Sequence, residues 1–425
     1  MVVIFMMFLF MFFVLVGFPI SFSLLLPSLV YVYIVNLPMK TILIRLINEY
    51  NSFILLAIPF FILAGKVMNK AKISDKLVLL ADLFVGSLKG GLAHINIVVS
   101  MFFGGCTGTA ISDTTAVGSI LIPAMKKEGY DADFSAAVTA ASSTMGPIIP
   151  PSIMFIVYGA MAGVSIGDLF LAGAIPGILI GFGQMALVAV LAYKYNFPRR
   201  VEKIKFKKAL VIIKSSILPM FLPVIILGGI ISGVMTPTEA AVSAAVYAIF
   251  LAVVVYRTLN FKELIKVITE AAIDSGRISI LIVAASLFGW IMVMEGIPTQ
   301  VANYLLQSGL PNIVILLLIN IFLLIVGMFI DSFPAIIMIT PVFLPIYRML
   351  GLSLLHAGIF SSMTLIIGVI TPPVGCCLFA ASSIAEVPYE KVALRILPFL
   401  AVNVAITLLV TYFPQIVLFL PGLFG

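Results

Sequence analysis

Charged and metal-binding residues are scarce in this chain of 425 residues. Only 10% of its residues are Asp, Glu, Lys or Arg, whereas a water-soluble domain has about a quarter, so a soluble globular fold is excluded. Its three cysteines, Cys106, Cys376 and Cys377, lack the spacing of a metal site. The sequence also lacks a GxxxxGK[S/T] phosphate loop, an HExxH motif and any pairing of a nucleophile with a histidine. We therefore expect neither enzyme activity nor a cofactor.

Long apolar runs make up most of the chain, and 63% of all residues are hydrophobic. A run of about 20 apolar residues spans a bilayer as a helix. Spans of this length must be helical because hydrocarbon offers no partners to free backbone groups. The N-terminus is apolar over residues 1–35, and its first basic residue is Lys40, which is typical of a membrane helix rather than a secretory signal peptide. The sequence predicts an all-α polytopic membrane protein.

Positive charge is concentrated in one segment between two apolar halves. Residues 197–214 contain seven Lys or Arg residues and one Glu, and so carry six of the seven net positive charges. Such a basic linker is typical of a cytoplasmic loop, where it can contact membrane lipids, and it does not indicate a nucleic-acid partner. From this loop outward, lysines mark further inner loops near residues 66–76 and 126–127. An amphipathic stretch, residues 260–275, is expected on the inner surface before a span at residues 278–294.

Two apolar segments do not fit simple spans, because each begins and ends on the same predicted side of the membrane. Residues 94–127 are interrupted by the sequence GGCTGT, and residues 312–348 are interrupted by GMFIDSFP. Glycine and proline release a helix, and Thr, Ser and Asp can satisfy the freed backbone groups. Each segment is predicted to be a re-entrant helical hairpin whose tip reaches the middle of the membrane.

Each predicted hairpin is followed by a span with an interruption of its own. The interruptions read TMGPIIPPS and VITPPVG, and adjacent prolines remove amide donors and clash with the preceding turn. We therefore predict two broken helices, at residues 130–162 and 353–384. Each should consist of two half-helices joined by unwound backbone.

Glycines and prolines recur in the two halves at a constant spacing of 222 positions. The pairs are Gly105 and Gly327, Pro123 and Pro345, Gly129 and Gly351, Gly146 and Gly368, Pro150 and Pro372, and Pro151 and Pro373. Each half has five predicted spans plus one hairpin, and an odd number of crossings inserts the second half upside down. This pattern predicts two inverted-topology repeats, as in secondary transporters, whose paired interruptions indicate the binding site.

The tips and interruptions are rich in oxygen atoms that suit a cation, while the N-termini of half-helices suit a carboxylate. Asp331 is the most informative residue, because a carboxylate at the centre of a span is costly and marks an ion pathway. We interpret Asp331 as a sodium ligand, with capping of the returning arm as the alternative. Asp113 fits either role equally well. Thr107 and Thr109 lie at the first tip, and Thr109 occupies the repeat position of Asp331.

Four segments carry a resemblance to a known family. GGCTGTAISDTTAVGSILIPAMKKEGY, PIIPPS, GVMTPTEAA and TPPVG resemble the large membrane subunit (M-type permease) of TRAP, or tripartite ATP-independent periplasmic, transporters. The resemblance covers nearly the whole chain and implies the elevator-type fold of divalent-anion/sodium symporters. It implies sodium-coupled uptake of an organic acid, of the sialic acid or C4-dicarboxylate class, across the bacterial cytoplasmic (inner) membrane. It also implies two partners: a small four-helix membrane subunit, expected as a separate chain, and a periplasmic substrate-binding protein.

The resemblance further implies a division of the chain and a set of site residues. Residues 1–90, 163–310 and 385–425 are expected to form scaffold and arm helices, the last of these ranges as one C-terminal helix. Residues 91–162 and 311–384 are expected to form the transport domain. The expected sodium-binding residues are Gly105, Thr107, Thr109, Ser112, Asp113, Gly146, Gly327, Asp331, Ser332, Thr371 and Gly375. The expected substrate-binding residues are Thr107, Pro150, Ser152, Asp331 and Pro373.

Other functions remain open at this point. A stand-alone divalent-anion/sodium symporter would share the architecture but need no binding protein. A channel should lack the inverted repeat, and an intramembrane enzyme should show a catalytic pair, so the sequence argues against both. The predicted pocket has no buried arginine, because Arg348 is expected at the outer mouth. Helix dipoles and hydroxyl groups are therefore expected to hold the anion, with a weak preference for sialic acid.

Overall fold

The computed structural model describes residues 1–50, 53–71, 73–199 and 206–424, and within these ranges it omits the side chains of residues 48–50, 73–74, 103–107, 206 and 208. Over the described backbone the secondary structure is helical, apart from one isolated bridge between Lys89 and Arg199. The prediction of an all-α membrane protein is confirmed. Seven helical stretches are long and apolar enough to cross a membrane within the described residues, and a pair bent by 48° would make an eighth.

The first half begins with arm helices and continues through one hairpin and one broken helix. Its elements are α1 (Val2–Leu15), α2 (Ile20–Ile34), α3 (Met39–Tyr50), the 3-10 turn η1 (Phe53–Leu56), α4 (Ala57–Lys70), α5 (Ile73–Val85), α6 (Gly91–Thr107), α7 (Ala110–Lys127), α8 (Ala132–Ser143), α9 (Ile153–Ala162) and α10 (Ile166–Lys194).

The second half follows the same order. Its elements are α11 (Phe206–Ile231), α12 (Pro237–Phe250), the π-helical turn η2 (Leu251–Val255), α13 (Phe261–Met294), α14 (Ile297–Gln307), α15 (Asn312–Phe329), α16 (Ser332–Met349), α17 (Leu354–Gly368), α18 (Cys376–Ala385), α19 (Tyr389–Arg395), α20 (Leu397–Tyr412) and α21 (Pro414–Phe424).

Helix bounds around the hairpins repeat at the spacing found in the sequence. Adding 222 to the bounds of α7 gives those of α16, residues 332–349, and adding 222 to the start of α8 gives Leu354, the start of α17. Gly129 and Gly351, at matching positions after the hairpins, both have positive φ values, 89° and 68°. The peptide bond between the paired prolines is cis in both interruptions. The opposite orientation of the two halves in the membrane stays a prediction.

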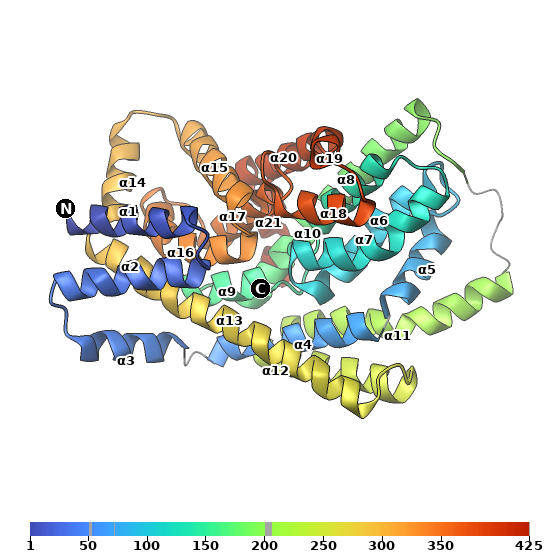
Figure 1. The fold of residues 1–425 in the computed structure, drawn as a ribbon, viewed down its shortest axis with the longest axis horizontal. Helices are drawn as coiled ribbons and strands as arrows, with labels where there is room; N and C mark the ends of the chain where they lie inside the picture. Colours follow the sequence, from blue (N-terminus) through green and yellow to red (C-terminus); the bar gives the residue numbers. More distant parts are fainter. Residues whose placement is uncertain (51–52, 72, 200–205, 425) are drawn as a thin grey trace.

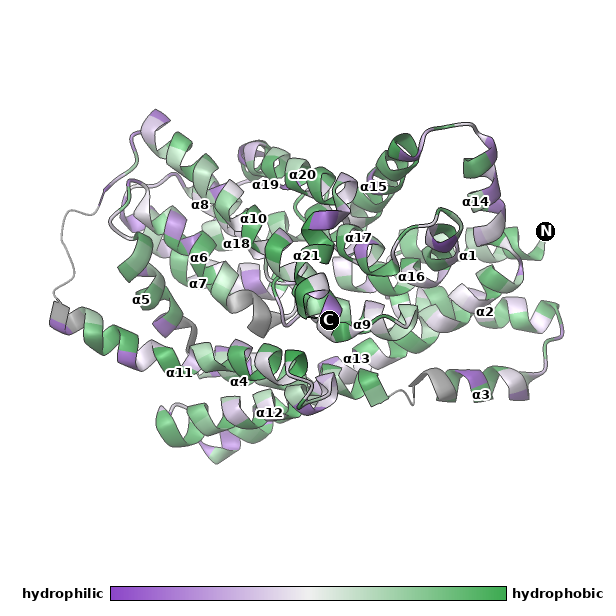
Figure 2. Ribbon diagram, turned by 180° about the vertical axis from the view of Figure 1, so that it is seen from behind, coloured by the Kyte–Doolittle hydropathy of each residue, from purple (hydrophilic) through white to green (hydrophobic). Residues whose placement is uncertain are grey.

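The helices form two groups that Figure 1 separates clearly. Helices α4, α11, α12 and α13 form a lower layer, and α4 packs against both α12 and α13. The hairpins and broken helices lie above this layer, with α10 and α20 packed among them. Figure 2 shows that most residues along the helices are hydrophobic. Many large apolar side chains, such as Phe8, Phe182 and Val224, are exposed. A surface of this kind is suited to contact with lipid.

Two details of the predicted secondary structure are wrong. Phe261–Met294 form one continuous helix, α13, rather than a surface helix followed by a separate span, because the helix continues through Gly276. Its start is defined by a capping box between Asn260 and Glu263. The range 385–425 was expected to be one helix, but its described part after α18 contains the three helices α19, α20 and α21, because Pro398 and Pro414 lie at the starts of new helices.

Candidate functional site

A cavity of about 670 Å³ lies between the lower layer and the tips of both hairpins. Its walls come from α4, α7, α9, α13 and α16, so it joins elements far apart in the sequence. Its lining includes Ile62, Gly65, Lys66, Asn69, Lys70, Thr109, Ser112, Thr115, Ala116, Ile153, Val267, Glu270, Asp274, Arg277, Ile278, Leu281, Asp331, Phe333 and Pro334. A concave space of this size with a few polar groups is suited to a small organic ligand.

The start of helix α7 contributes a polar edge to this cavity. Thr109 is the N-cap of α7, and its Oγ1 accepts a hydrogen bond from the Ser112 amide at 3.3 Å. The Thr109 hydroxyl also donates to Ser112 Oγ at 2.8 Å, and both side chains line the cavity. Because a helix N-terminus carries partial positive charge, this edge favours an anion.

Two more helices begin beside the cavity. Ser152 is the N-cap of α9, where it accepts from the Phe155 amide and donates to the Pro147 carbonyl, and the next residue, Ile153, lines the cavity. Asp331 is the N-cap residue of α16 and lines the cavity with Phe333. The Ser332 hydroxyl donates to Asp331 Oδ1 at 3.3 Å. Thr109 and Asp331 thus occupy matching positions at the two tips, as the repeat predicts.

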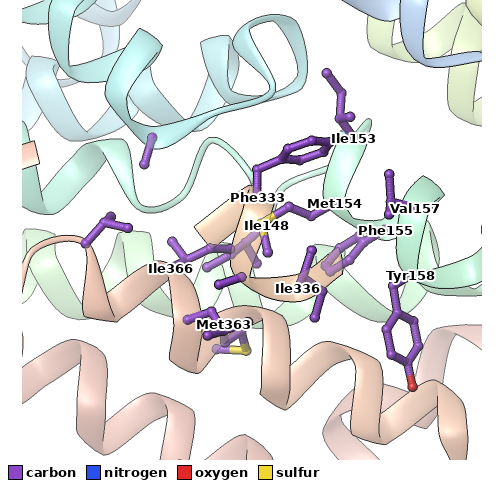
Figure 3. Close-up of a cluster of buried hydrophobic side chains, with 14 of the residues drawn as sticks. Ile148, Ile153, Met154, Phe155, Val157, Tyr158, Phe333, Ile336, Met363 and Ile366 are labelled. Carbon is purple, nitrogen blue, oxygen red and sulfur yellow. The ribbon is translucent and has the colours of Figure 1, made fainter. Parts of the chain in front are cut away.

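The second tip rests on apolar side chains from both halves of the chain. Figure 3 shows Phe333 and Ile336 of α16 beside Ile148, Met154 and other residues of the first broken helix, with Met363 and Ile366 of α17 nearby. Phe333, Ile336 and Met154 are all buried. Phe333 belongs both to this cluster and to the cavity lining, so the apolar cluster packs against the side of the cavity next to Asp331.

Asp113 lies behind the first tip and is fully buried. Neither of its carboxylate oxygens makes a hydrogen bond of normal geometry among the described residues, and the Ser100 hydroxyl is the nearby polar group that faces it. The neighbouring Thr114 hydroxyl instead donates to Ser143 Oγ on α8, at 2.7 Å. A buried carboxylate without a partner is costly, and a bound cation would remove that cost.

Each hairpin is tied to its own broken helix through an asparagine. Asn96 on α6 accepts a hydrogen bond from Ser142 on α8 at 2.9 Å and donates to Thr139 at 2.7 Å. Asn320 on α15 accepts from Thr364 on α17 at 2.6 Å. Ser142 and Thr364 are 222 positions apart. These buried bonds position the hairpin arms against the interrupted helices.

The second interruption is held against the second tip by backbone contacts. The Gly375 amide donates to the Met328 carbonyl at 3.2 Å, and the Thr371 hydroxyl donates to the Ile367 carbonyl at 2.8 Å. The Pro373 carbonyl accepts from the Tyr389 hydroxyl at 2.9 Å. The backbone oxygens of this interruption are therefore partly engaged within the chain.

The structure brings together three of the predicted site residues, Thr109, Ser112 and Asp331, around one cavity. The predicted residues Asp113, Gly146, Pro150, Ser152, Gly327, Ser332, Thr371, Pro373 and Gly375 lie at the interruptions and tips around it, outside its lining. Gly105 and Thr107 belong to α6, but beyond this helical backbone they lie outside what the structure describes.

A charged wall of the cavity escaped the sequence reasoning. Lys66 Nζ lies 2.7 Å from Asp274 Oδ2, and Arg277 bonds to Asp274 Oδ1 at 3.1 Å. The lysines near residue 66 served only as markers of the inner side, and nothing in the local pattern connects α4 with α13. The available signal for a shared helix face was the spacing of Lys66 from Ile62, Asn69 and Lys70, each three or four residues away.

Comparisons with known proteins agree with this architecture. The family model for the DctM component of tripartite ATP-independent periplasmic transporters matches residues 5–416. The chain is similar to the sialic acid TRAP transporter large permease protein SiaM of Vibrio cholerae, with 35% identity over 412 residues and 96% of both chains covered.

Two further comparisons extend the similarity. The C4-dicarboxylate TRAP transporter large permease protein DctM of Pseudomonas aeruginosa is 36% identical over 386 residues, which cover 91% of this chain and 90% of that one. Among solved structures, the Alcanivorax borkumensis YdaH transporter, described as having an unusual topology, superposes with a TM-score of 0.65 at 13% identity over 88% of each chain. At that identity the similarity concerns the fold.

Proposed function

We propose that this chain, which belongs to the DctM component family of the tripartite ATP-independent periplasmic transporters, carries out sodium-coupled uptake of an organic acid across the bacterial inner membrane. Membership makes it a membrane permease subunit and not an enzyme. The observation that supports this mechanism most directly is the single cavity in which the two hairpin tips meet, with Thr109 on one side and Asp331 on the other.

Sodium is the proposed coupling ion. Unwound backbone and hydroxyl groups near the tips supply the uncharged oxygens that a hard monovalent cation takes up. Asp331 and the fully buried Asp113 supply negative charge close to these oxygens. One sodium ion at each hairpin and its adjacent interruption would neutralise these carboxylates in the membrane interior, where an uncompensated charge is costly.

The proposed substrate is an organic acid of the sialic acid or C4-dicarboxylate class. One of the two relatives above is a sialic acid permease and the other a C4-dicarboxylate permease, so the similarity supports the wider class of organic acids. The N-termini of α7, α9 and α16 beside the cavity would attract the carboxylate through their partial positive charge.

The direction of access follows from charge. Lys66, Lys70 and Arg277 line the cavity, and positive residues mark the cytoplasmic side of membrane proteins. We therefore assign this conformation to the release stage, with the cavity facing the cytoplasm. In the proposed elevator cycle the hairpins and broken helices move the site across the bilayer against the layer of α4, α11, α12 and α13.

Family membership implies two further components, a small membrane subunit and a periplasmic binding protein that delivers the substrate. The alternative is a stand-alone divalent-anion/sodium symporter, which would share the architecture but need no binding protein. Uptake into proteoliposomes separates the two. We expect uptake only with the small subunit, the binding protein and an inward sodium gradient. Uptake that persists without the binding protein would favour the stand-alone symporter, and uptake without sodium would contradict the coupling.

A further inference from the structure

Lys66 is placed to meet a ligand in the cavity as well as its present partner. It lies on the face of α4 that lines the cavity, and 29% of its side-chain surface is exposed. The hairpin tips of α7 and α16 line the same space. A partly exposed ammonium group in a ligand-sized cavity is a strong hydrogen-bond donor for a carboxylate.

The present partner of Lys66 is shared with a second cation. Lys66 pairs with one carboxylate oxygen of Asp274, and Arg277 pairs with the other. Arg277 can therefore continue to neutralise Asp274 if Lys66 turns away. The Lys66–Asp274 pair is also accessible to water, since 36% of the Asp274 side chain is exposed. Separating these two side chains therefore costs less free energy than breaking a buried ion pair.

The charges around the cavity favour such an exchange once sodium is present. Lys66, Lys70 and Arg277 face Glu270, Asp274 and Asp331, three positive against three negative residues. In the proposed function a sodium ion at Asp331 adds one positive charge. The cavity then has an excess of positive charge that an organic anion balances.

We propose that Lys66 binds a carboxylate of the transported solute by exchanging its bond to Asp274 for one to the solute, an inference that rests on the proposed function. In this scheme Asp274 competes with the solute for Lys66, and the return of Asp274 to Lys66 helps to release the solute. The sequence alone predicted that helix dipoles and hydroxyl groups hold the anion. Lys66 adds a full charge to that set.

A purely structural ion pair between α4 and α13 predicts different results for variants of Lys66 and Asp274 than a pair in which Lys66 binds the solute. If the pair only fastens the helices, loss of either residue should be equally harmful, and exchanging the two charges should restore function. If Lys66 serves the solute, loss of Asp274 should instead strengthen solute binding, because a competitor has gone.

The test is uptake by the complete three-component system in proteoliposomes, with radiolabelled N-acetylneuraminate and malate as probes. The wild type identifies which of the two is transported. KM for that solute and the sodium concentration at half-maximal rate are then measured for Lys66→Ala, Lys66→Arg, Asp274→Asn and the double exchange Lys66→Asp with Asp274→Lys. Lys266→Ala is the matched control, since Lys266 is exposed on α13 outside the cavity lining.

We expect Lys66→Ala to raise the solute KM by about ten- to a hundredfold, the effect of losing one charge-assisted hydrogen bond, with the sodium dependence unchanged. Lys66→Arg should keep most of the affinity, Asp274→Asn should lower KM, and the double exchange should stay defective. An unchanged KM in Lys66→Ala overturns the inference, and so does recovery in the double exchange.

Should Lys66→Ala fail to fold, Asp274→Asn decides the question alone, since a raised KM there contradicts competition. The outcomes also separate this inference from the function on which it rests. If the wild type transports neither probe, or transports one without sodium, the proposed function fails and the inference with it. If the wild type transports a probe with sodium and Lys66→Ala has an unchanged solute KM, the inference about Lys66 is contradicted but the proposed function is not.

Discussion

Gly327 in the second hairpin lies directly against Gly368 at the end of α17. A Cβ atom added to Gly368 would lie 2.5 Å from both the Cα and the carbonyl carbon of Gly327, and one added to Gly327 would lie 2.5 Å from the Leu365 carbonyl oxygen. All of these are backbone atoms, which cannot rotate away as a side chain could. The contact therefore requires glycine on both sides.

Gly368→Ala is expected to push the second hairpin away from α17 and so to disturb the tip that holds Asp331. Overpacking of this kind typically costs about 1–3 kcal/mol of stability. Thermal unfolding of the purified protein in detergent should show a lower midpoint, and reconstituted uptake should fall. Gly228→Ala is the control, because a Cβ there meets nothing within 4 Å. Equal stability of the two variants would mean that the hairpin adjusts freely.

Asp331→Asn is expected to weaken sodium-driven uptake strongly, because it removes the negative charge at the second tip while keeping the shape of the side chain. The decisive measurement is the initial rate of uptake as a function of sodium concentration. If the rate of the variant depends on sodium as in the wild type, Asp331 is not a sodium ligand and serves only as the N-cap residue of α16.

Asp113→Asn should raise the sodium concentration needed for half-maximal uptake, by about tenfold or more if a charged ligand is lost. Because both carboxylate oxygens are buried without partners in the described structure, the folded protein itself should not be weakened. A variant that is more stable without sodium, yet gains less stability from added sodium, would be the clearest support. Asp75→Asn, at an exposed position on α5, controls for the loss of one negative charge. Identical sodium curves for wild type and Asp113→Asn would contradict the assignment.

Arg395→Ala is expected to loosen the start of α8 from α19. Arg395 lies 3.1 Å from both Asp131 and Asp133, and 30% of its side chain is exposed. Because the three groups are partly solvated, we expect a loss of about 1 kcal/mol that shrinks at high salt. Thermal midpoints at low and high ionic strength measure it. A loss that is independent of salt would point to packing against Tyr195 instead.

The sequence predicted closely where the chain breaks between α6 and α7, between α8 and α9, between α15 and α16 and between α17 and α18, because glycine and proline act locally. The adjacent prolines that begin at Pro150 and Pro372 interrupt a helix, whereas the single prolines Pro123 and Pro345 lie inside α7 and α16. The constant spacing of 222 positions meant that an interruption in one half predicted one in the other. Gly276 shows the limit of this reasoning. A lone glycine inside a helix costs only about 1 kcal/mol, and α13 continues through it.

The candidate site was predictable only in part. Thr109 and Asp331 were identified because they stand at interruptions of apolar sequence, where polar groups need an explanation. Lys66 and Asp274 stand on regular helices, more than 200 positions apart, and only the packing of α4 against α13 brings them together. Local sequence patterns contain no information about that packing.

The apolar cluster in Figure 3 has a consequence for the chain as a whole. Ile148 and Met154 belong to the first half, whereas Phe333, Ile336 and Met363 belong to the second, and together they form one interior. Although the two halves resemble each other, neither contains its own complete core. If the gene were divided in the basic linker, both fragments would have to be made together, and each would remain prone to degradation until it met the other in the bilayer.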